Sequence, residues 1–193
     1  MQEDVFKILL LGGGNACKAG KTSLRLRFIY NTFSTKIFNT VGVEFGQKVL
    51  SFEDDQAKQH TARLQMWDIA GSQSKNYLTK IYYTESTAAV IVFDITQPSS
   101  LLEDAKAWLT DLKAKLKLAV PVILLANKVD LNPSFQITEE DREKINQWCQ
   151  DNKLSWFAVS AAQDQGEGDS VTVAEAFTIL SSEVVRWQST LHV

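Results

Sequence analysis

The sequence predicts an α/β fold with helices on both faces of a six-stranded, mostly parallel sheet. Apolar runs of strand length alternate along the chain with segments of helical periodicity, which is the pattern of strand–helix–strand units. Two of the runs, 88–93 and 120–126, contain no polar residue, as expected of parallel strands buried on both faces. No internal repeat or linker interrupts the 193 residues, so we expect one domain spanning 1–193.

The individual elements follow from these patterns in chain order. The expected strands are the apolar or alternating runs 6–11, 41–52, 61–68, 88–93, 120–126 and 154–159. The expected helices have apolar residues three or four positions apart and lie at 22–30, 102–116, around 145–149 and at 173–191. The acidic segment 53–55 can form a turn, so we expect the second and third strands to form a hairpin. The second strand would then be the antiparallel edge strand of the sheet. Ser100 and Glu103 have the spacing of a capping box for the helix that follows.

Composition and charge exclude several classes of protein. The net charge of −3 gives no general attraction to nucleic acid or to anionic lipid. Two cysteines and two histidines exclude a disulfide framework, argue against a zinc site and fit a reducing compartment. No apolar run reaches the length of about 18 residues that a membrane span needs. Residues 1–7 lack the features of a signal peptide, so we expect a cytoplasmic protein.

Polar residues follow the first expected strand where it leads into a helix, at Ala19-Gly20-Lys21-Thr22-Ser23. Ligands of such sheets bind at the carboxyl ends of the strands. A phosphate chain needs backbone N–H groups, a helix N-terminus and a cation, all of which this segment can supply. The Thr22 hydroxyl would then coordinate Mg²⁺. The alternative is a chance Gly-Lys-Thr sequence at a helix start, because Asn15 stands where the full motif has Gly.

Three other strand ends carry polar residues that suit different parts of one nucleotide. Asn127-Lys128-Val129-Asp130 follows the fifth strand, and its carboxylate can accept hydrogen bonds from guanine N1–H and the 2-amine, a pair that adenine lacks. Ser160-Ala161-Ala162 follows the last strand, and its N–H groups can meet the guanine carbonyl oxygen. Asp68-Ile69-Ala70-Gly71 offers a carboxylate for a metal-bound water and a Gly amide for a terminal phosphate. Each could alone be an ordinary polar turn, but their joint order predicts a guanine-nucleotide site.

With these motifs the chain resembles the small GTPases of the Ras superfamily, and most of all the Rab family, from about Phe6 to Trp187. The segments that carry the resemblance are 20–23 (GKTS), 40–45 (TVGVEF), 67–71 (WDIAG), 82–83 (YY), 127–130 (NKVD) and 160–161 (SA). The WDIAG motif is similar to that of the Rab branch linked to lysosome-related organelles. The resemblance implies a P-loop NTPase G domain that acts as a GTP/GDP switch in vesicle traffic and hydrolyses GTP.

The resemblance also assigns roles to individual residues. Those implied to bind nucleotide are Cys17, Lys18, Ala19, Gly20, Lys21, Thr22, Ser23, Phe33, Thr40, Gly71, Asn127, Lys128, Asp130, Ser160, Ala161 and Ala162. Thr22, Thr40 and Asp68 would hold Mg²⁺, and Lys21 would also serve in catalysis. Phe45, Trp67 and Tyr82 resemble an aromatic trio that faces effectors, although such aromatics can equally pack in or beside the core.

The resemblance implies partners as well. Effectors, an exchange factor and a GTPase-activating protein would bind switch I (35–43) and switch II (69–77), and the chain would be a monomer that binds no nucleic acid. Rab chains end in prenylated cysteines, whereas this chain has no cysteine after Cys149. We expect that the sequence is a trimmed G domain, and that a lipidated tail would place the protein peripherally on an intracellular membrane.

The chain departs from the family pattern in two places. The interval from Lys7 to Lys21 is longer than in ordinary members by about three residues, all within 12–18, so we expect nucleotide binding with altered affinity. Ser72 stands where the family has the Gln that orients the attacking water. A Ser hydroxyl is too short for that task, so we expect hydrolysis slower by about one or two orders of magnitude.

These departures leave two alternatives to a cycling switch. One is a pseudo-GTPase scaffold that holds nucleotide permanently or not at all, which the longer loop and Ser72 both favour. The other is a P-loop enzyme that acts on ATP, which conflicts with Asp130.

Overall fold

Six strands form one sheet in the computed structural model, which describes residues 4–13, 18–71, 79–97, 102–131, 138–163 and 170–191. The strands are β1 (Asp4–Gly12), β2 (Val43–Glu53), β3 (Gln59–Ile69), β4 (Ala88–Asp94), β5 (Val122–Asn127) and β6 (Ser155–Val159). Their order is β2-β3-β1-β4-β5-β6, with β2 antiparallel to β3 and the other neighbouring pairs parallel. The fold class expected from the sequence is therefore confirmed, including its antiparallel edge strand.

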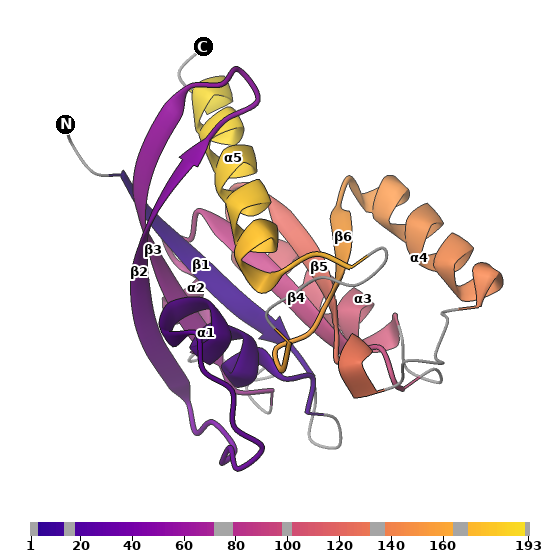
Figure 1. The fold of residues 1–193 in the computed structure, drawn as a ribbon. Helices are drawn as coiled ribbons and strands as arrows, with labels where there is room; N and C mark the ends of the chain where they lie inside the picture. Colours follow the sequence, from indigo (N-terminus) through magenta and orange to yellow (C-terminus); the bar gives the residue numbers. More distant parts are fainter. Residues whose placement is uncertain are drawn as a thin grey trace.

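Helices cover both faces of this sheet (Figure 1). The helices are α1 (Lys21–Tyr30), α2 (Thr79–Tyr83), α3 (Glu103–Lys115), α4 (Glu139–Asn152) and α5 (Val173–Leu191), with a short 3-10 helix η3 (Val129–Leu131) after β5. Side chains of α1 and α5 belong to the core on one face, whereas those of α2, α3 and α4 belong to the core on the other. Among the described residues, no helix is long and apolar enough to cross a membrane.

The two cores follow from the period of two along each strand. In β1, Phe6, Ile8 and Leu10 lie in the core beneath α1 and α5, and Leu9 and Leu11 lie in the core beneath α3. Every residue of β4 and β5 is buried, because helices cover both of their faces. This burial is why these two strands appear in the sequence as unbroken apolar runs.

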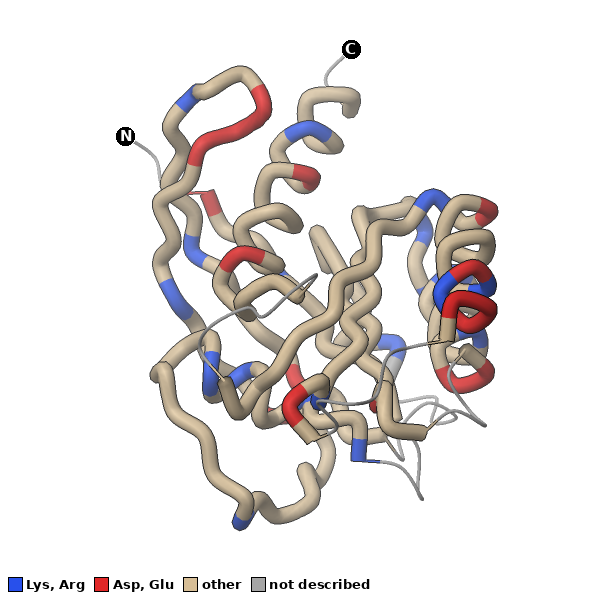
Figure 2. Tube along the Cα trace, turned by 45° about the vertical axis from the view of Figure 1, so that its right-hand side comes forward, with Lys and Arg blue, Asp and Glu red and all other residues tan. Residues whose placement is uncertain are grey.

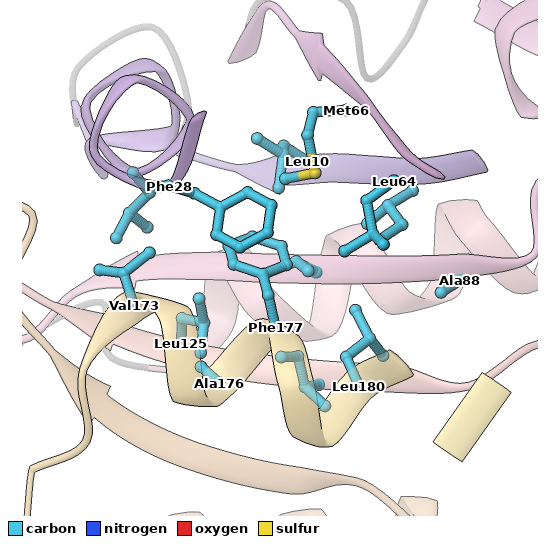
Figure 3. Packing of buried hydrophobic residues seen from close by; sticks show 14 of the residues in the cluster. Leu10, Phe28, Leu64, Met66, Ala88, Leu125, Val173, Ala176, Phe177 and Leu180 are labelled. Carbon is cyan, nitrogen blue, oxygen red and sulfur yellow. The ribbon is translucent and has the colours of Figure 1, made fainter. Parts of the chain in front are cut away.

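The core on the α1 and α5 face is centred on two aromatic rings. Phe28 of α1 and Phe177 of α5 have ring centroids 4.3 Å apart, and Leu10, Met66 and Leu180 surround them (Figure 3). The apolar stripe of α5 was expected to continue to Leu191, but that residue is 47% exposed. The buried residues of α5 end at Val184, and its later turns run beside the end of the β2–β3 hairpin, where Arg186 pairs with Asp55 (Figure 1).

Most element boundaries differ from the sequence expectation by one to three residues. The fifth strand begins at Val122 and not at Val120, since Pro121 has no N–H to donate to a ladder. The expected cap residue of α3, Ser100, lies outside the described residues, and the N-cap position of the helix is Leu102, whose side chain makes no capping hydrogen bond.

Candidate nucleotide-binding site

A cavity of about 460 Å³ lies where β1, β3, β5 and β6 end. Its volume is typical of sites that enclose a small organic ligand. The residues that line it are Lys18, Ala19, Gly20, Lys21, Thr22, Ser23, Phe33, Ser34, Thr35, Ile37, Phe38, Asn39, Thr40, Ala70, Gly71, Asn127, Lys128, Asp130, Leu131, Ala161 and Ala162. Most of the residues expected to hold nucleotide are therefore brought together at this cavity.

The entrance to α1 is shaped for close approach of a ligand to the backbone. Gly20 has φ +90°, and a Cβ at this position would lie 2.3 Å from Nδ2 of Asn127. Any other residue would be strained there and would collide with that side chain. The first N–H groups of α1 therefore open on the cavity beside Gly20, and the Nζ of Lys21 donates a 2.7 Å hydrogen bond to the carbonyl of Gly12. This arrangement gives an anion both N–H donors and a cation.

The end of β1 is held in place by neighbouring elements. Gly12 has φ +130°, and a Cβ there would lie 2.0 Å from the carbonyl oxygen of Val92 in β4. The buried indole N–H of Trp108, on α3, donates a 2.8 Å hydrogen bond to the carbonyl of Gly13. Trp108 was not predicted as a site residue, because in the sequence it is indistinguishable from the core residues of the apolar stripe of α3. Cys17 and most of the lengthened loop fall outside the described residues.

The hydroxyls of Thr22 and Thr40 line the cavity, and Thr22 joins them to the carboxylate of Asp68, which is buried and is not itself part of the lining. The hydroxyl of Thr22 lies 2.9 Å from that of Thr40 and donates a 2.5 Å hydrogen bond to Oδ2 of Asp68. Asp68 is fully buried, and its Oδ1 accepts no hydrogen bond from the described residues. A buried carboxylate oxygen without a partner costs free energy unless a cation or water completes it. Two hydroxyls and a carboxylate are the hard oxygen ligands that Mg²⁺ prefers, so these residues fit the metal.

Charges around Asp68 oppose the cost of its burial. Burial raises the pKa of the Asp68 carboxyl, while the hydrogen bond from Thr22 and the charges of Lys21 and Arg25 lower it in part. Arg25 is itself buried, with Nε 3.8 Å from Oδ2 of Asp68 and an ion pair to Glu44 of β2. A bound cation would add further stabilisation to the ionised carboxylate.

Asn127 joins the two ends of the cavity. Its Nδ2 donates a 2.9 Å hydrogen bond to the carbonyl of Ala19, and its Oδ1 accepts a 3.2 Å hydrogen bond from the N–H of Ala161. The neighbouring Lys128 has φ +75° and places Nζ 2.6 Å from Oδ2 of Asp94. The segment after β5 is thus fixed to the phosphate end through Asn127 and to β4 through Asp94, a residue that the sequence analysis did not single out.

Asp130 lies at the base end, supported by Ser160. The Ser160 hydroxyl donates a 2.5 Å hydrogen bond to Oδ1 of Asp130 and accepts 3.0 Å hydrogen bonds from the N–H groups of Ala162 and Gln163. Ser160 is not among the residues that line the cavity, although it was expected to contact nucleotide. Its contacts instead hold Asp130 and the loop after β6 in a fixed relation.

The segment between α1 and β2 forms the outer wall of the cavity. Phe33 lines it and is 42% exposed, as suits a ring that covers the edge of a base or sugar. Ile37, Phe38 and Asn39, which lie in the expected switch I, also line it, together with Ser34, which no motif in the sequence indicated. Gly71 lines the cavity at the end of β3, whereas Ser72 lies outside the described residues.

Among the three aromatics of the expected effector surface, Trp67 makes a ring contact with each of the other two. The ring centroids of Phe45 and Trp67 are 5.5 Å apart, and those of Trp67 and Tyr82 are 6.3 Å apart. Phe45 is 50% exposed, whereas Trp67 and Tyr82 are partly buried against the core. The Nζ of Lys7 lies 4.5 Å from the centre of the Trp67 ring on the same face of the sheet. The trio is therefore neither wholly core nor wholly exposed.

Lysines line the cavity, whereas the acidic residues gather mainly at two places away from it. Acidic residues gather on α4 and at the tip of the β2–β3 hairpin (Figure 2). The lining of the cavity contains Lys18, Lys21 and Lys128, with Asp130 as its carboxylate at the base end. A nucleoside triphosphate would therefore meet Lys18 and Lys21 at its phosphate end and the Asp130 carboxylate at its base end.

Comparison with known proteins agrees with this geometry. Residues 7–186 match the Ras family. The chain is 34% identical to "Ras-related protein Rab-32B" of Dictyostelium discoideum over 100% of its own length and 69% of that protein. It is 33% identical to "Ras-related protein Rab-32" of Homo sapiens over 95% of its own length and 76% of that protein. It is also 33% identical to human "Ras-related protein Rab-7L1", with coverage of 96% and 85%. The fold, the strand-end motifs and these matches together place the chain in the Rab family of Ras-related small GTPases.

Proposed function

We propose that this chain is a switch in membrane traffic that binds GDP and GTP with Mg²⁺ in the cavity at the strand ends. The observation that carries the proposal is that Lys21, Gly71 and Asp130, which are far apart in the sequence, line one cavity of nucleotide size. Membership of the Rab family supports GTP hydrolysis as the general activity. It does not favour a scaffold that has lost nucleotide binding.

At the phosphate end, the N–H groups of residues 18–23 and the ammonium of Lys21 bind the β- and γ-phosphates. Thr22, Thr40 and Asp68 would hold Mg²⁺, which would supply positive charge to neutralise the phosphates. The amide of Gly71 faces the γ-phosphate and lets the segment after β3 respond to its presence.

At the base end, the carboxylate of Asp130 accepts hydrogen bonds from guanine N1–H and the 2-amine, which excludes adenine. The loop of Ala161 and Ala162 lies against the 6-oxygen, and Phe33 covers the exposed edge of the base or sugar. Asn127 joins this end to the phosphate end through Ala19, and Lys128 fixes it to β4 through Asp94.

The proposal is tested by nucleotide retention in the presence of Mg²⁺. We expect purified protein to retain GDP or GTP at micromolar concentration, and its melting temperature to rise with GTP but not with ATP, because a ligand that binds only the folded state stabilises it. Retention of neither nucleotide would leave only the scaffold function. Equal stabilisation by ATP would contradict the role of Asp130.

Ser72 makes hydrolysis slow in the absence of partners, so Ser72→Gln should raise the single-turnover rate about 10- to 100-fold. The longer amide side chain can orient the attacking water, which the Ser hydroxyl cannot reach. The rate is measured on protein preloaded with GTP, and the GDP dissociation rate of the same variant serves as the control for intact binding. A variant no faster than the native chain would show that Ser72 does not limit the reaction.

We further propose that effectors, an exchange factor and an activating protein bind the segments 35–43 and 69–77 together with Phe45, Trp67 and Tyr82. Contact among the three rings and the exposure of Phe45 support this surface. The chain acts as a monomer, and a lipidated tail would hold it peripherally on an intracellular membrane. An activating protein that supplies its own water-orienting side chain would restore rapid hydrolysis.

A further inference from the structure

Arg27, in the last turn of α1, makes contacts that no nucleotide motif accounts for. Its Nε donates a 2.8 Å hydrogen bond to the carbonyl of Ala161, and its Nη2 donates a 2.9 Å hydrogen bond to the carbonyl of Ala162. Its Nη1 donates to the side chain of Asn31 at 2.8 Å and to the carbonyl of that residue at 3.3 Å. Arg27 does not line the cavity, so it would act on a ligand only through other residues.

The fork geometry of the guanidinium is what makes these contacts specific. A planar guanidinium offers N–H donors in fixed directions, so two of them can hold two successive carbonyls only when the peptide planes have one orientation. In a trans peptide the C=O and N–H groups point in opposite directions. With the carbonyls of Ala161 and Ala162 directed at Arg27, the N–H groups of Ala162 and Gln163, which belong to the same two peptides, are directed away from it.

The N–H groups of Ala162 and Gln163 donate to the Ser160 hydroxyl, which in turn donates to Asp130 at the base end. The preceding N–H, that of Ala161, donates to Asn127. Arg27 therefore holds the loop 160–162 through its carbonyls, whereas the N–H groups of the loop join it to Asn127 and, through the Ser160 hydroxyl, to Asp130.

The same guanidinium also reaches the start of the outer wall. Asn31 is the C-cap of α1, in the left-handed conformation with φ +53°, and the wall that contains Phe33 begins two residues later. One side chain thus joins the helix that begins with Lys21, the loop after β6 and the start of the segment that covers the cavity. Arg25, two residues earlier on α1, turns instead to Asp68 and Glu44 at the metal end.

We propose that Arg27 is a positioning residue for guanine recognition, which fixes the orientation of the loop 160–162 and so slows release of the nucleotide. This inference rests on the proposed function of the cavity. Stabilisation of α1 alone would not require these two hydrogen bonds, because their acceptors are consecutive carbonyls more than 130 positions away in the chain.

The test compares Arg27→Met, Arg27→Lys and the native chain, each loaded with a fluorescent GDP analogue and Mg²⁺. Arg186→Met is the matched control, because Arg186 is an exposed arginine of α5 whose ion pair with Asp55 lies away from the cavity. Release of a fluorescent GDP analogue is followed after addition of excess GDP. Backbone hydrogen exchange is measured in parallel on peptides that cover 158–163 and 21–24.

We expect Arg27→Met to release GDP about tenfold faster, as the loss of two charge-assisted hydrogen bonds to a ligand-holding loop implies. Arg27→Lys, which can reach only one carbonyl, should lie between Arg27→Met and the native chain. Exchange should accelerate in 158–163 and stay unchanged in 21–24, and Arg186→Met should match the native chain in both measurements.

Release from Arg27→Met at the native rate, or equal acceleration of exchange in both peptides, would overturn the proposal in favour of a merely structural role. If Arg27→Met does not fold, the test rests on Arg27→Lys. Native rates of GDP release and of hydrogen exchange in that variant would then overturn the proposal. A native chain that retains no GDP would instead contradict the proposed function, while exchange in 158–163 would still report whether Arg27 holds the loop.

Discussion

Replacing Lys21 by Met is expected to lower the affinity for both GDP and GTP about a thousandfold, because an ammonium that serves two phosphates makes several charge-assisted hydrogen bonds. The Nζ of Lys21 already lies beside the carbonyl of Gly12, at the centre of the phosphate end. Methionine preserves the length and the apolar stem of the side chain and removes only the charge and the donors. The loss should therefore appear as faster release with little change in the unfolding of the protein itself.

The matched control is Lys48→Met. Lys48 also donates a 2.7 Å hydrogen bond to a backbone carbonyl, that of Phe28, but it does not line the cavity. Titration with a fluorescent GDP analogue should give native affinity for this control. If the affinity of Lys21→Met for the GDP analogue is within a few-fold of the native value, the segment 18–23 does not bind the phosphates as proposed.

Replacing Asp130 by Asn should exchange guanine for xanthine as the preferred base. A carboxylate accepts from both N1–H and the 2-amine of guanine, whereas an amide presents one acceptor and one donor. The donor would face the 2-amine of guanine without a partner but would match the 2-oxygen of xanthine. Leaving polar groups unpaired in a desolvated site is costly, so GDP affinity should fall about 100- to 1,000-fold.

Competition between GDP and xanthosine diphosphate for the Asp130→Asn variant measures the exchange directly, since xanthosine diphosphate acts as an internal control for folding. The native chain should strongly prefer GDP, and Asp130→Asn should prefer xanthosine diphosphate. Equal loss of both nucleotides would indicate collapse of the contact with Ser160 and not a change of selectivity. Unchanged preference for GDP would separate Asp130 from base recognition.

The sheet could be predicted from the sequence because its physical causes are local or periodic. β4 and β5 are covered on both faces, which leaves unbroken apolar runs at 88–93 and 120–126. The hairpin of β2 and β3 alternates because one of its faces is largely open to solvent. Since strands of such a sheet end at one edge, the polar residues that follow them could be expected to meet there.

Residues that support the site through distant contacts could not be predicted in this way. Trp108 continues the apolar stripe of α3, and nothing in its spacing distinguishes it from a core residue that makes no hydrogen bond. Arg27 looks like one more charged residue near a helix C-terminus, where a positive charge is favourable in any case. Asp94 ends an apolar strand like many turn residues, and its bond to Lys128 depends on how two strands lie side by side.

The bridge formed by Asn127 has a consequence for how often the switch can be reset. Both of its hydrogen bonds join protein atoms, one to Ala19 and one from Ala161, so neither must be remade when a ligand departs. The phosphate end and the base end of the cavity are thus preorganised relative to each other. A nucleotide that binds therefore loses little of its binding free energy to ordering the chain around it. Release of the bound nucleotide is then governed by the strength of its own contacts with the cavity, which are what an exchange factor has to weaken.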